Sequence, residues 1–239
     1  MKTIQRRFNL NAAKIAGALY LTIAVLGGFS IMYVPGEIIN LADPEATIKN
    51  LTSQQSLFRL GVAADILTFM IEIVLTMILY QLFKGVNKTL ARIAILARFA
   101  MIIIMGINLV VYTTPLFMVS NPALSALFDQ DQMNATIMLL FNMHQNMILL
   151  WGLFFGFHVL ILGFLVYASG DYPKLLGSLL LIGSFGYLLE SFAHFALPAN
   201  TTISAIVVGL LIVVVIGELS FAFWLLIKGA TSKVAVAMI

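Results

Sequence analysis

The sequence contains no cysteine and few charged residues, and both shortages limit the chemistry it can perform. Without cysteine, the chain has no disulfides, no thiolate metal ligands and no cysteine nucleophile. Charged residues make up 10% of the chain, whereas they make up about a quarter of a typical soluble domain. The motifs GxSxG, GxGxxG and GxxxxGKS/T are also missing, so a serine hydrolase or a nucleotide-binding protein has no support.

Apolar residues are correspondingly abundant: they make up 62% of the 239 residues, and the mean hydropathy is +1.05. A water-soluble core could not hide this much apolar surface, so we expect an integral membrane protein with the lipid bilayer as its partner. The net charge of +3 could suggest nucleic acid, but the basic residues are spread along the chain instead of clustered. We therefore expect no nucleic-acid partner.

Six apolar segments are each long enough to cross a hydrocarbon core of roughly 30 Å. They predict an all-α fold, a polytopic bundle of six transmembrane helices forming a single domain over residues 1–239. The expected spans are residues 12–34, 57–83, 90–114, 135–168, 174–197 and 203–228. Proline cannot continue a helix, and glycine suits the left-handed position beyond a helix end. The expected stops are therefore Pro35, Pro115 and Pro198 for the odd-numbered segments, and Gly85, Gly170 and Gly229 for the even-numbered ones.

Positive charge predicts the orientation, because cytoplasmic loops carry an excess of lysine and arginine. Most of the basic residues lie on the side of the two termini: Lys2, Arg6, Arg7, Lys14, Lys84, Lys88, Arg92, Lys174, Lys228 and Lys233. Only Lys49 and Arg59 lie on the other side, so both termini should be cytoplasmic. In the outer loops, Asp43 and Asn121 each precede a proline, which predicts short interfacial helices capped by these side chains.

Ionisable residues inside the apolar segments are expected at two depths. Counting back from the cytoplasmic ends at about 1.5 Å per residue places Glu72, His158 and Glu218 roughly 15–18 Å deep, near the bilayer midplane. Arg98 is shallower, and it either snorkels towards the cytoplasm or reaches inward as a counter-charge. We expect the carboxylates to be neutral or paired, because an isolated charge in a low dielectric is unfavourable. A proton relay and an interhelical hydrogen-bond network are both consistent with this midplane layer.

A second polar layer is expected near the outer boundary, roughly 24–30 Å from the cytoplasmic ends. Asp65, Glu190 and His194 fall at this depth; His144 comes out still higher by the same count, and we include it because the fourth segment is over-long and is expected to tilt. These residue types could bind a ligand, hold a divalent metal such as zinc, or form a hydrogen-bonded network that fixes helix register. No HExxH spacing is present, and the sequence demands no cofactor.

Several stretches taken in order resemble a known family: LFRLGVAADI, LYQLFKGVNKTLARIA, GFHVLILGFLVYASGDYPKLLGSLLLIGSFGYLLES and GELSFAFWLLIKG. They are similar to the bacterial membrane family catalogued as domain of unknown function 4386, from about Ala13 to Gly229. The resemblance implies a bacterial cytoplasmic-membrane protein with several spans. It implies no activity, ligand or catalytic residue.

Three functions therefore stay open for the polar interior. The leading hypothesis is that a small or lipophilic ligand is bound or moved through an outward-facing polar cavity lined by the outer layer. The first alternative is a membrane-embedded hydrolase in which a metal held by the outer layer activates water. The second alternative is a non-catalytic accessory or sensory subunit whose polar layers only specify packing. The sequence leaves the oligomeric state open.

Overall fold

The computed structural model describes the backbone of residues 2–229 and the side chains of residues 11–229, and its regular structure is helical throughout. Six helices are long and apolar enough to cross a membrane, so the prediction of an all-α, multi-pass membrane fold is confirmed at that level. These spans are Asn11–Ile38, Gln55–Phe83, Lys88–Ser120, Gln130–Ser169, Lys174–Ala196 and Thr201–Lys228. Lys233, placed on the cytoplasmic side by the sequence, lies outside the described residues.

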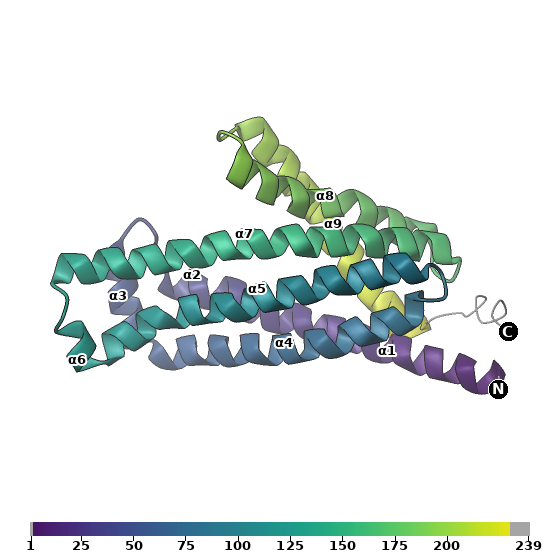
Figure 1. Cartoon of the computed structure of the whole chain (residues 1–239), viewed down its shortest axis with the longest axis horizontal. Helices are drawn as coiled ribbons and strands as arrows, with labels where there is room; N and C mark the ends of the chain where they lie inside the picture. The colour runs from purple at the N-terminus through teal and green to yellow at the C-terminus, as the bar shows by residue number, and fades with distance from the viewer. Residues whose placement is uncertain (1, 230–239) are drawn as a thin grey trace. The chain divides into compact units, whose positions relative to one another are not determined.

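The helices follow one another with short connections (Figure 1). In chain order they are α1 (Lys2–Gly27), the π-helix η1 (Gly28–Tyr33), α2 (Val34–Ile38), α3 (Pro44–Ser53), α4 (Gln55–Phe83), α5 (Lys88–Ser120), α6 (Pro122–Ser125), α7 (Gln130–Ser169), α8 (Lys174–Ala196) and α9 (Thr201–Lys228). The first membrane-length helix thus passes from α1 through η1 into α2 without a loop.

Two of the three predicted proline stops are wrong. Pro35 lies near the start of α2, which continues η1 without a loop, so the helix passes through this proline to Ile38 although the proline lacks an N–H for the preceding turn. Pro115 lies inside α5, which continues to Ser120, because an internal proline removes one hydrogen bond and bends a helix without having to end it. Only Pro198 behaves as expected: α8 ends at Ala196, and Leu197 is extended, as a residue before proline prefers.

The predicted glycine stops are mostly correct. Gly170 and Gly229 have φ of +69° and +68°, the left-handed region that glycine enters without a steric penalty. The second span also stops where predicted, because α4 ends at Phe83, but Gly85 does not adopt the left-handed conformation.

The two predicted N-caps in the long loops are confirmed. The Asp43 side chain accepts a hydrogen bond from the backbone N–H of Ala46, and this contact begins α3. The Asn121 side chain accepts hydrogen bonds from the N–H groups of Ala123 and Leu124 and begins α6. Short helices therefore stand where the sequence predicts them; their position at a membrane boundary stays a prediction.

By their internal contacts the residues fall into two compact units. Unit 1 comprises the described parts of Met1–Thr22, Ile71–Ile102 and Leu149–Ile239, and unit 2 comprises Ile23–Met70 and Ile103–Ile148. Four long helices, α1, α4, α5 and α7, contribute residues to both units. The single domain predicted for residues 1–239 stays a prediction.

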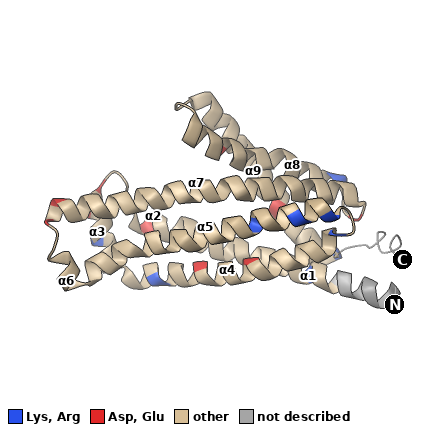
Figure 2. Ribbon diagram, in the orientation of Figure 1, with Lys and Arg blue, Asp and Glu red and all other residues tan. Residues whose placement is uncertain are grey.

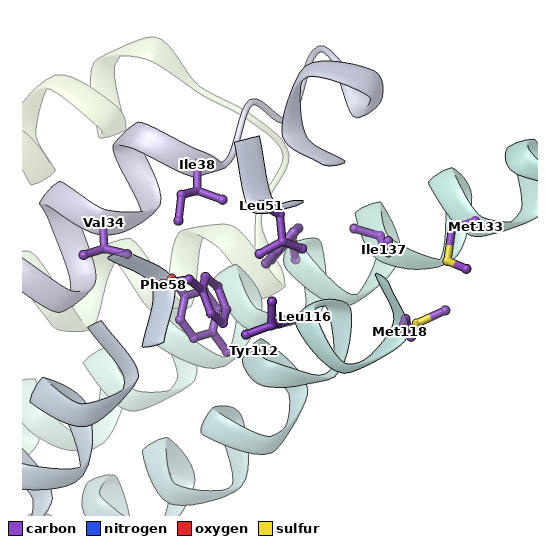
Figure 3. Packing of buried hydrophobic residues seen from close by; sticks show 10 residues of the cluster. Val34, Ile38, Leu51, Phe58, Tyr112, Leu116, Met118, Met133 and Ile137 are labelled. Atoms are coloured by element: carbon purple, nitrogen blue, oxygen red, sulfur yellow. The ribbon is translucent and has the colours of Figure 1, made fainter. Parts of the chain in front are cut away.

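Unit 2 has a dense apolar core of aliphatic and aromatic side chains. Figure 3 shows Phe58 and Tyr112 at its centre, with Val34, Ile38 and Leu116 nearby. The rings of Phe58 and Tyr112 lie 4.6 Å apart between centroids, a separation typical of favourable aromatic pairs. The core brings η1, α2 and α3 together with parts of α4, α5 and α7.

In unit 1, α8 and α9 lie side by side (Figure 1), and glycines let their backbones approach closely. A Cβ added at Gly183 of α8 would lie 2.5 Å from the backbone of Val214 on α9, and one at Gly186 would lie 2.8 Å from Leu211. Small residues at such positions are typical of helix pairs in membranes, where close packing replaces the hydrophobic effect as the driving force.

Charged residues are sparse along these helices, and Figure 2 shows them as isolated bands on otherwise uncharged ribbons. Large apolar side chains are instead exposed on the outer faces of the helices, among them Val25, Met70 and Leu96. Soluble monomers rarely expose so much apolar surface, whereas hydrocarbon chains solvate it without penalty.

Candidate functional site

Arg98 on α5 lies at the centre of a polar cluster in unit 1 and is 1% exposed. Its Nη2 lies 2.6 Å from Glu72 Oε2 on α4, a charge contact without the alignment of a hydrogen bond. Its Nη1 lies 3.0 Å from His158 Nε2 on α7. Of the two orientations that the sequence left open for Arg98, the structure shows the inward one.

The partners of His158 fix its tautomer. Nδ1 lies 2.9 Å from the backbone carbonyl of Ala94, and a carbonyl can only accept, so Nδ1 carries the hydrogen. Nε2 faces the Arg98 guanidinium, which can only donate, so Nε2 is the unprotonated acceptor. His158 is therefore a neutral imidazole held on both sides, and it orients the arginine.

Two further side chains complete the unit 1 cluster. The hydroxyl of Tyr20 on α1 accepts a long hydrogen bond of 3.4 Å from Arg98 Nη1, and its ring centroid lies 5.3 Å from the guanidinium carbon. This distance suits a cation–π contact. Glu218 on α9 is half-buried and interacts electrostatically with both Arg98 and Glu72. The structure thus brings together all four residues of the predicted midplane layer.

Asp65 belongs to a second polar cluster, in unit 2, and is 5% exposed. It lies on α4 seven residues before Glu72, so both carboxylates project from one face of the helix, and both are buried. The Ser30 hydroxyl of η1 is close enough to interact with the Asp65 carboxylate but makes no hydrogen bond of good geometry. Tyr112 on α5 also interacts electrostatically with Asp65.

His144 on α7 joins this unit 2 cluster through Asn108 and Tyr112. The amide nitrogen of Asn108 donates to the backbone carbonyl of His144 at 3.3 Å, and the amide oxygen lies 3.1 Å from His144 Nδ1. That oxygen can only accept, so Nδ1 carries the hydrogen and Nε2 keeps a free lone pair. The His144 ring stacks on Tyr112 with 4.3 Å between centroids.

Several buried polar atoms of this cluster have no hydrogen-bond partner among the described residues. They are Ser30 Oγ, Tyr112 Oη and His144 Nε2; Thr68 Oγ1, three residues after Asp65 on α4, also lacks a partner. Buried polar atoms in native proteins are nearly always hydrogen-bonded, to protein, water or ligand. Two of these atoms, Ser30 Oγ and Tyr112 Oη, belong to side chains that interact with the buried Asp65 carboxylate.

Glu190 and His194 lie on α8 in unit 1, one turn apart, and interact electrostatically with each other. Glu190 is half-buried and His194 is exposed. The combination of these two residues with Asp65 and His144 in one outer layer stays a prediction. Within residues 2–229, no three histidine or acidic side chains gather closely enough to hold a metal ion, and the zinc site likewise stays a prediction.

Some members of the two clusters were missed in the sequence: Tyr20, Ser30, Asn108 and Tyr112. Asn108 offers a signal that could have identified it, because it interrupts a run of apolar residues and an amide is unfavourable in lipid unless it is hydrogen-bonded. Ser30 has a weaker signal, since serine is common in membrane helices. It is the buried residue of η1, and π-helical turns recur at functional sites.

Comparisons with known proteins identify the family but no activity. A stretch of 77 residues is 44% identical to an uncharacterized protein of Archaeoglobus fulgidus, and it covers 32% of this chain and 43% of that protein. The match thus spans less than half the length of this relative. No solved structure matches the chain. The family model described as Domain of unknown function (DUF4386) matches residues 15–229, nearly the whole length, and the chain belongs to that family.

Proposed function

We propose that this multi-pass membrane protein binds a small cationic ligand in the unit 2 cluster around Asp65 and His144. The observation that carries the proposal is the buried Asp65 carboxylate. Among the described residues no lysine or arginine pairs with it, while polar atoms around it lack hydrogen-bond partners. A carboxylate in an apolar interior needs a counter-charge or a proton, and a bound cation supplies the first.

The chemistry of the cluster favours a ligand that donates hydrogen bonds. The Asp65 carboxylate and the His144 Nε2 lone pair both accept, and the hydroxyls of Ser30 and Tyr112 can do so as well. A primary or secondary ammonium group offers positive charge and two or three donors in a small volume. The apolar rings of Phe58 and Phe141 in the same unit would contact a lipophilic body attached to that group.

We place the protein in the bacterial cytoplasmic membrane with both termini on the cytoplasmic side. The asymmetric distribution of lysine and arginine along the sequence supports this orientation. Asp65 precedes the cytoplasmic end of α4 by nineteen residues, counted to Lys84, which is roughly 28 Å of helix. The ligand would therefore enter from the outer side, as expected for an outward-facing polar site.

The binding experiment uses the purified full chain in lipid nanodiscs and n-butylammonium as the probe. We expect calorimetry to detect butylammonium binding to the wild type and at least tenfold weaker binding to Asp65→Asn, a loss of about 1.4 kcal/mol. Glu45→Gln is the matched control, because Glu45 is an exposed carboxylate on α3 and should leave the affinity unchanged. 1-Pentanol, which is similar in size and uncharged, should bind much more weakly.

Two results would contradict the proposal: equal affinity of wild type and Asp65→Asn for butylammonium, or equal affinity of the wild type for the alcohol. Elemental analysis of the same preparations tests the zinc alternative. Stoichiometric zinc in the wild type that is lost in His144→Ala would replace the ammonium by a metal ion as the cation at this site.

A further inference from the structure

We infer that Glu218 carries an exchangeable proton beside the Glu72–Arg98 ion pair of unit 1. This site is separate from the cation site proposed around Asp65 and uses none of its residues. Protonation adds H⁺ from water to one carboxylate oxygen of Glu218, which converts the carboxylate to a neutral carboxylic acid. The net charge of the unit 1 cluster then changes from −1 to 0.

The inference starts from the charge balance of the cluster. Two carboxylates, Glu72 and Glu218, interact with each other and share one cation, Arg98. Arg98 Nη2 lies 2.6 Å from a carboxylate oxygen of Glu72, whereas Arg98 Nη1 contacts two neutral groups, Tyr20 and His158. The positive charge of Arg98 therefore neutralises Glu72 first. In an apolar membrane interior a second, unneutralised carboxylate is strongly unfavourable, and a proton removes that penalty.

Among the side chains that the structure describes, no other group in the cluster supplies the missing positive charge. The groups that interact with Glu218 come from separate helices: Tyr20 on α1, Glu72 on α4, Arg98 on α5 and Tyr187 on α8. His158 on α7 contacts Arg98, and its two hydrogen bonds hold it as the neutral imidazole. Protonating His158 would turn its Nε2 from an acceptor into a donor facing the guanidinium. The tyrosines are neutral and can hydrogen-bond to Glu218 in either of its protonation states.

The burial of the two carboxylates also supports Glu72 as the ionised group and Glu218 as the protonated one. Glu72 is 6% exposed and lies against Arg98, whereas Glu218 is half-buried. The more exposed Glu218 is therefore the carboxylate that can gain or lose a proton without breaking the contact between Glu72 and Arg98. The assignment gives the two carboxylates different roles: Glu72 neutralises the arginine, and Glu218 gains and loses the proton.

The test is infrared spectroscopy of the full chain in lipid nanodiscs, with glutamate labelled by ¹³C. We expect a carbonyl band of a protonated carboxylic acid at neutral pH that shifts with the ¹³C label, shifts in D₂O and disappears at alkaline pH. Glu218→Gln should lose the whole band. Glu190→Gln is the matched control, because Glu190 is also a half-buried glutamate in unit 1, and this variant should retain the band.

A band that persists in Glu218→Gln, or a wild type without any glutamic acid band, would overturn the inference. A band that sodium abolishes at constant neutral pH would also overturn it, because the site would then prefer a metal cation to a proton. If Glu218→Gln does not fold, Glu218→Asp replaces it. The band should then follow a ¹³C label on aspartate and no longer respond to one on glutamate.

Discussion

The guanidinium of Arg98 meets acceptor groups from three other helices, and this arrangement allows a full charge to lie inside an apolar bundle. Removing one partner of a buried ion pair destabilises a protein far more than replacing both, because the remaining charge keeps its desolvation penalty. The Glu72–Arg98 pair should therefore respond very differently to single and double substitution, and this difference can be measured.

We predict that Glu72→Gln lowers the free energy of unfolding by about 3–5 kcal/mol, because it removes the only carboxylate among the described residues that contacts the buried Arg98 and leaves the more distant Glu218 to balance its charge. Adding Arg98→Met should restore most of this loss, since methionine fills similar space without charge. The measurement is unfolding in mixed micelles with increasing denaturing detergent, followed by circular dichroism. Glu45→Gln, at an exposed position, should change stability by no more than about 0.5 kcal/mol. A Glu72→Gln variant as stable as Glu45→Gln would contradict the prediction.

The position of a residue along its helix could be predicted from the sequence, but the direction in which a long side chain points could not. Counting residues from the helix ends placed Glu72, His158 and Glu218 at one level, because the rise per residue is constant. The inward turn of Arg98 could not be predicted, since its long side chain can reach either way from the same Cα. The carbonyl of Ala94, which fixes the tautomer of His158, has no signature in any sequence.

At the scale of the helices, the backbones of α8 and α9 approach closely. Adding one methyl group to a glycine in these helices should show how much this close approach contributes to stability. Gly183 of α8 has no room for a Cβ, which would lie 2.5 Å from the backbone of Val214. Gly209 of α9 has no atom within 4 Å of the same added carbon. The two glycines thus give a matched pair for one substitution.

We predict that Gly183→Ala destabilises the protein by about 1–3 kcal/mol, because the added methyl forces the two helices apart. Gly209→Ala should be neutral or stabilising by up to about 1 kcal/mol, because alanine is the better helix former. Unfolding of both variants in mixed micelles, compared with the wild type, provides the measurement. Equal effects of the two substitutions would show that α8 and α9 are not packed as the structure has them.

The N-cap of α3 provides a second test at this scale. Asp43→Ala removes the acceptor for the Ala46 N–H, and we expect it to lower the stability of unit 2 by about 1 kcal/mol. Asp43→Asn keeps a capping oxygen and should retain most of that stability. Protection of the α3 amides from hydrogen exchange is the direct readout; unchanged protection in Asp43→Ala would contradict the role of the cap.

The helices themselves were largely predictable, because a run of some twenty apolar residues has few alternatives to a membrane helix. The residues at which the helices end were harder to predict. Pro115 was expected to end a helix, yet α5 continues past it, since a long helix tolerates the loss of one hydrogen bond. The π-helical turn of η1 was not predicted either, because one extra residue in a helical turn leaves no pattern in hydropathy.

At the scale of the whole molecule, the described structure holds two polar clusters of different charge balance in two compact units. The unit 1 cluster contains one ion pair and a second carboxylate, and the unit 2 cluster contains a carboxylate without a basic partner. The two proposals give these carboxylates different counterparts: a proton for Glu218 and a cation for Asp65. Proton binding and cation binding in one membrane protein would permit exchange of the two species, and each is testable by itself.

The predicted orientation of the spans is simple to test, because the chain has no cysteine of its own. A single cysteine at Thr89, at the start of α5 between Lys88 and Arg92, should face the cytoplasm. One at Ala126, just after α6, should face outward. Both positions are exposed. We predict that a membrane-impermeant maleimide labels Ala126→Cys in intact cells but labels Thr89→Cys only after the cells are opened. The reverse pattern would place the termini outside and move the entrance to Asp65 to the cytoplasmic side.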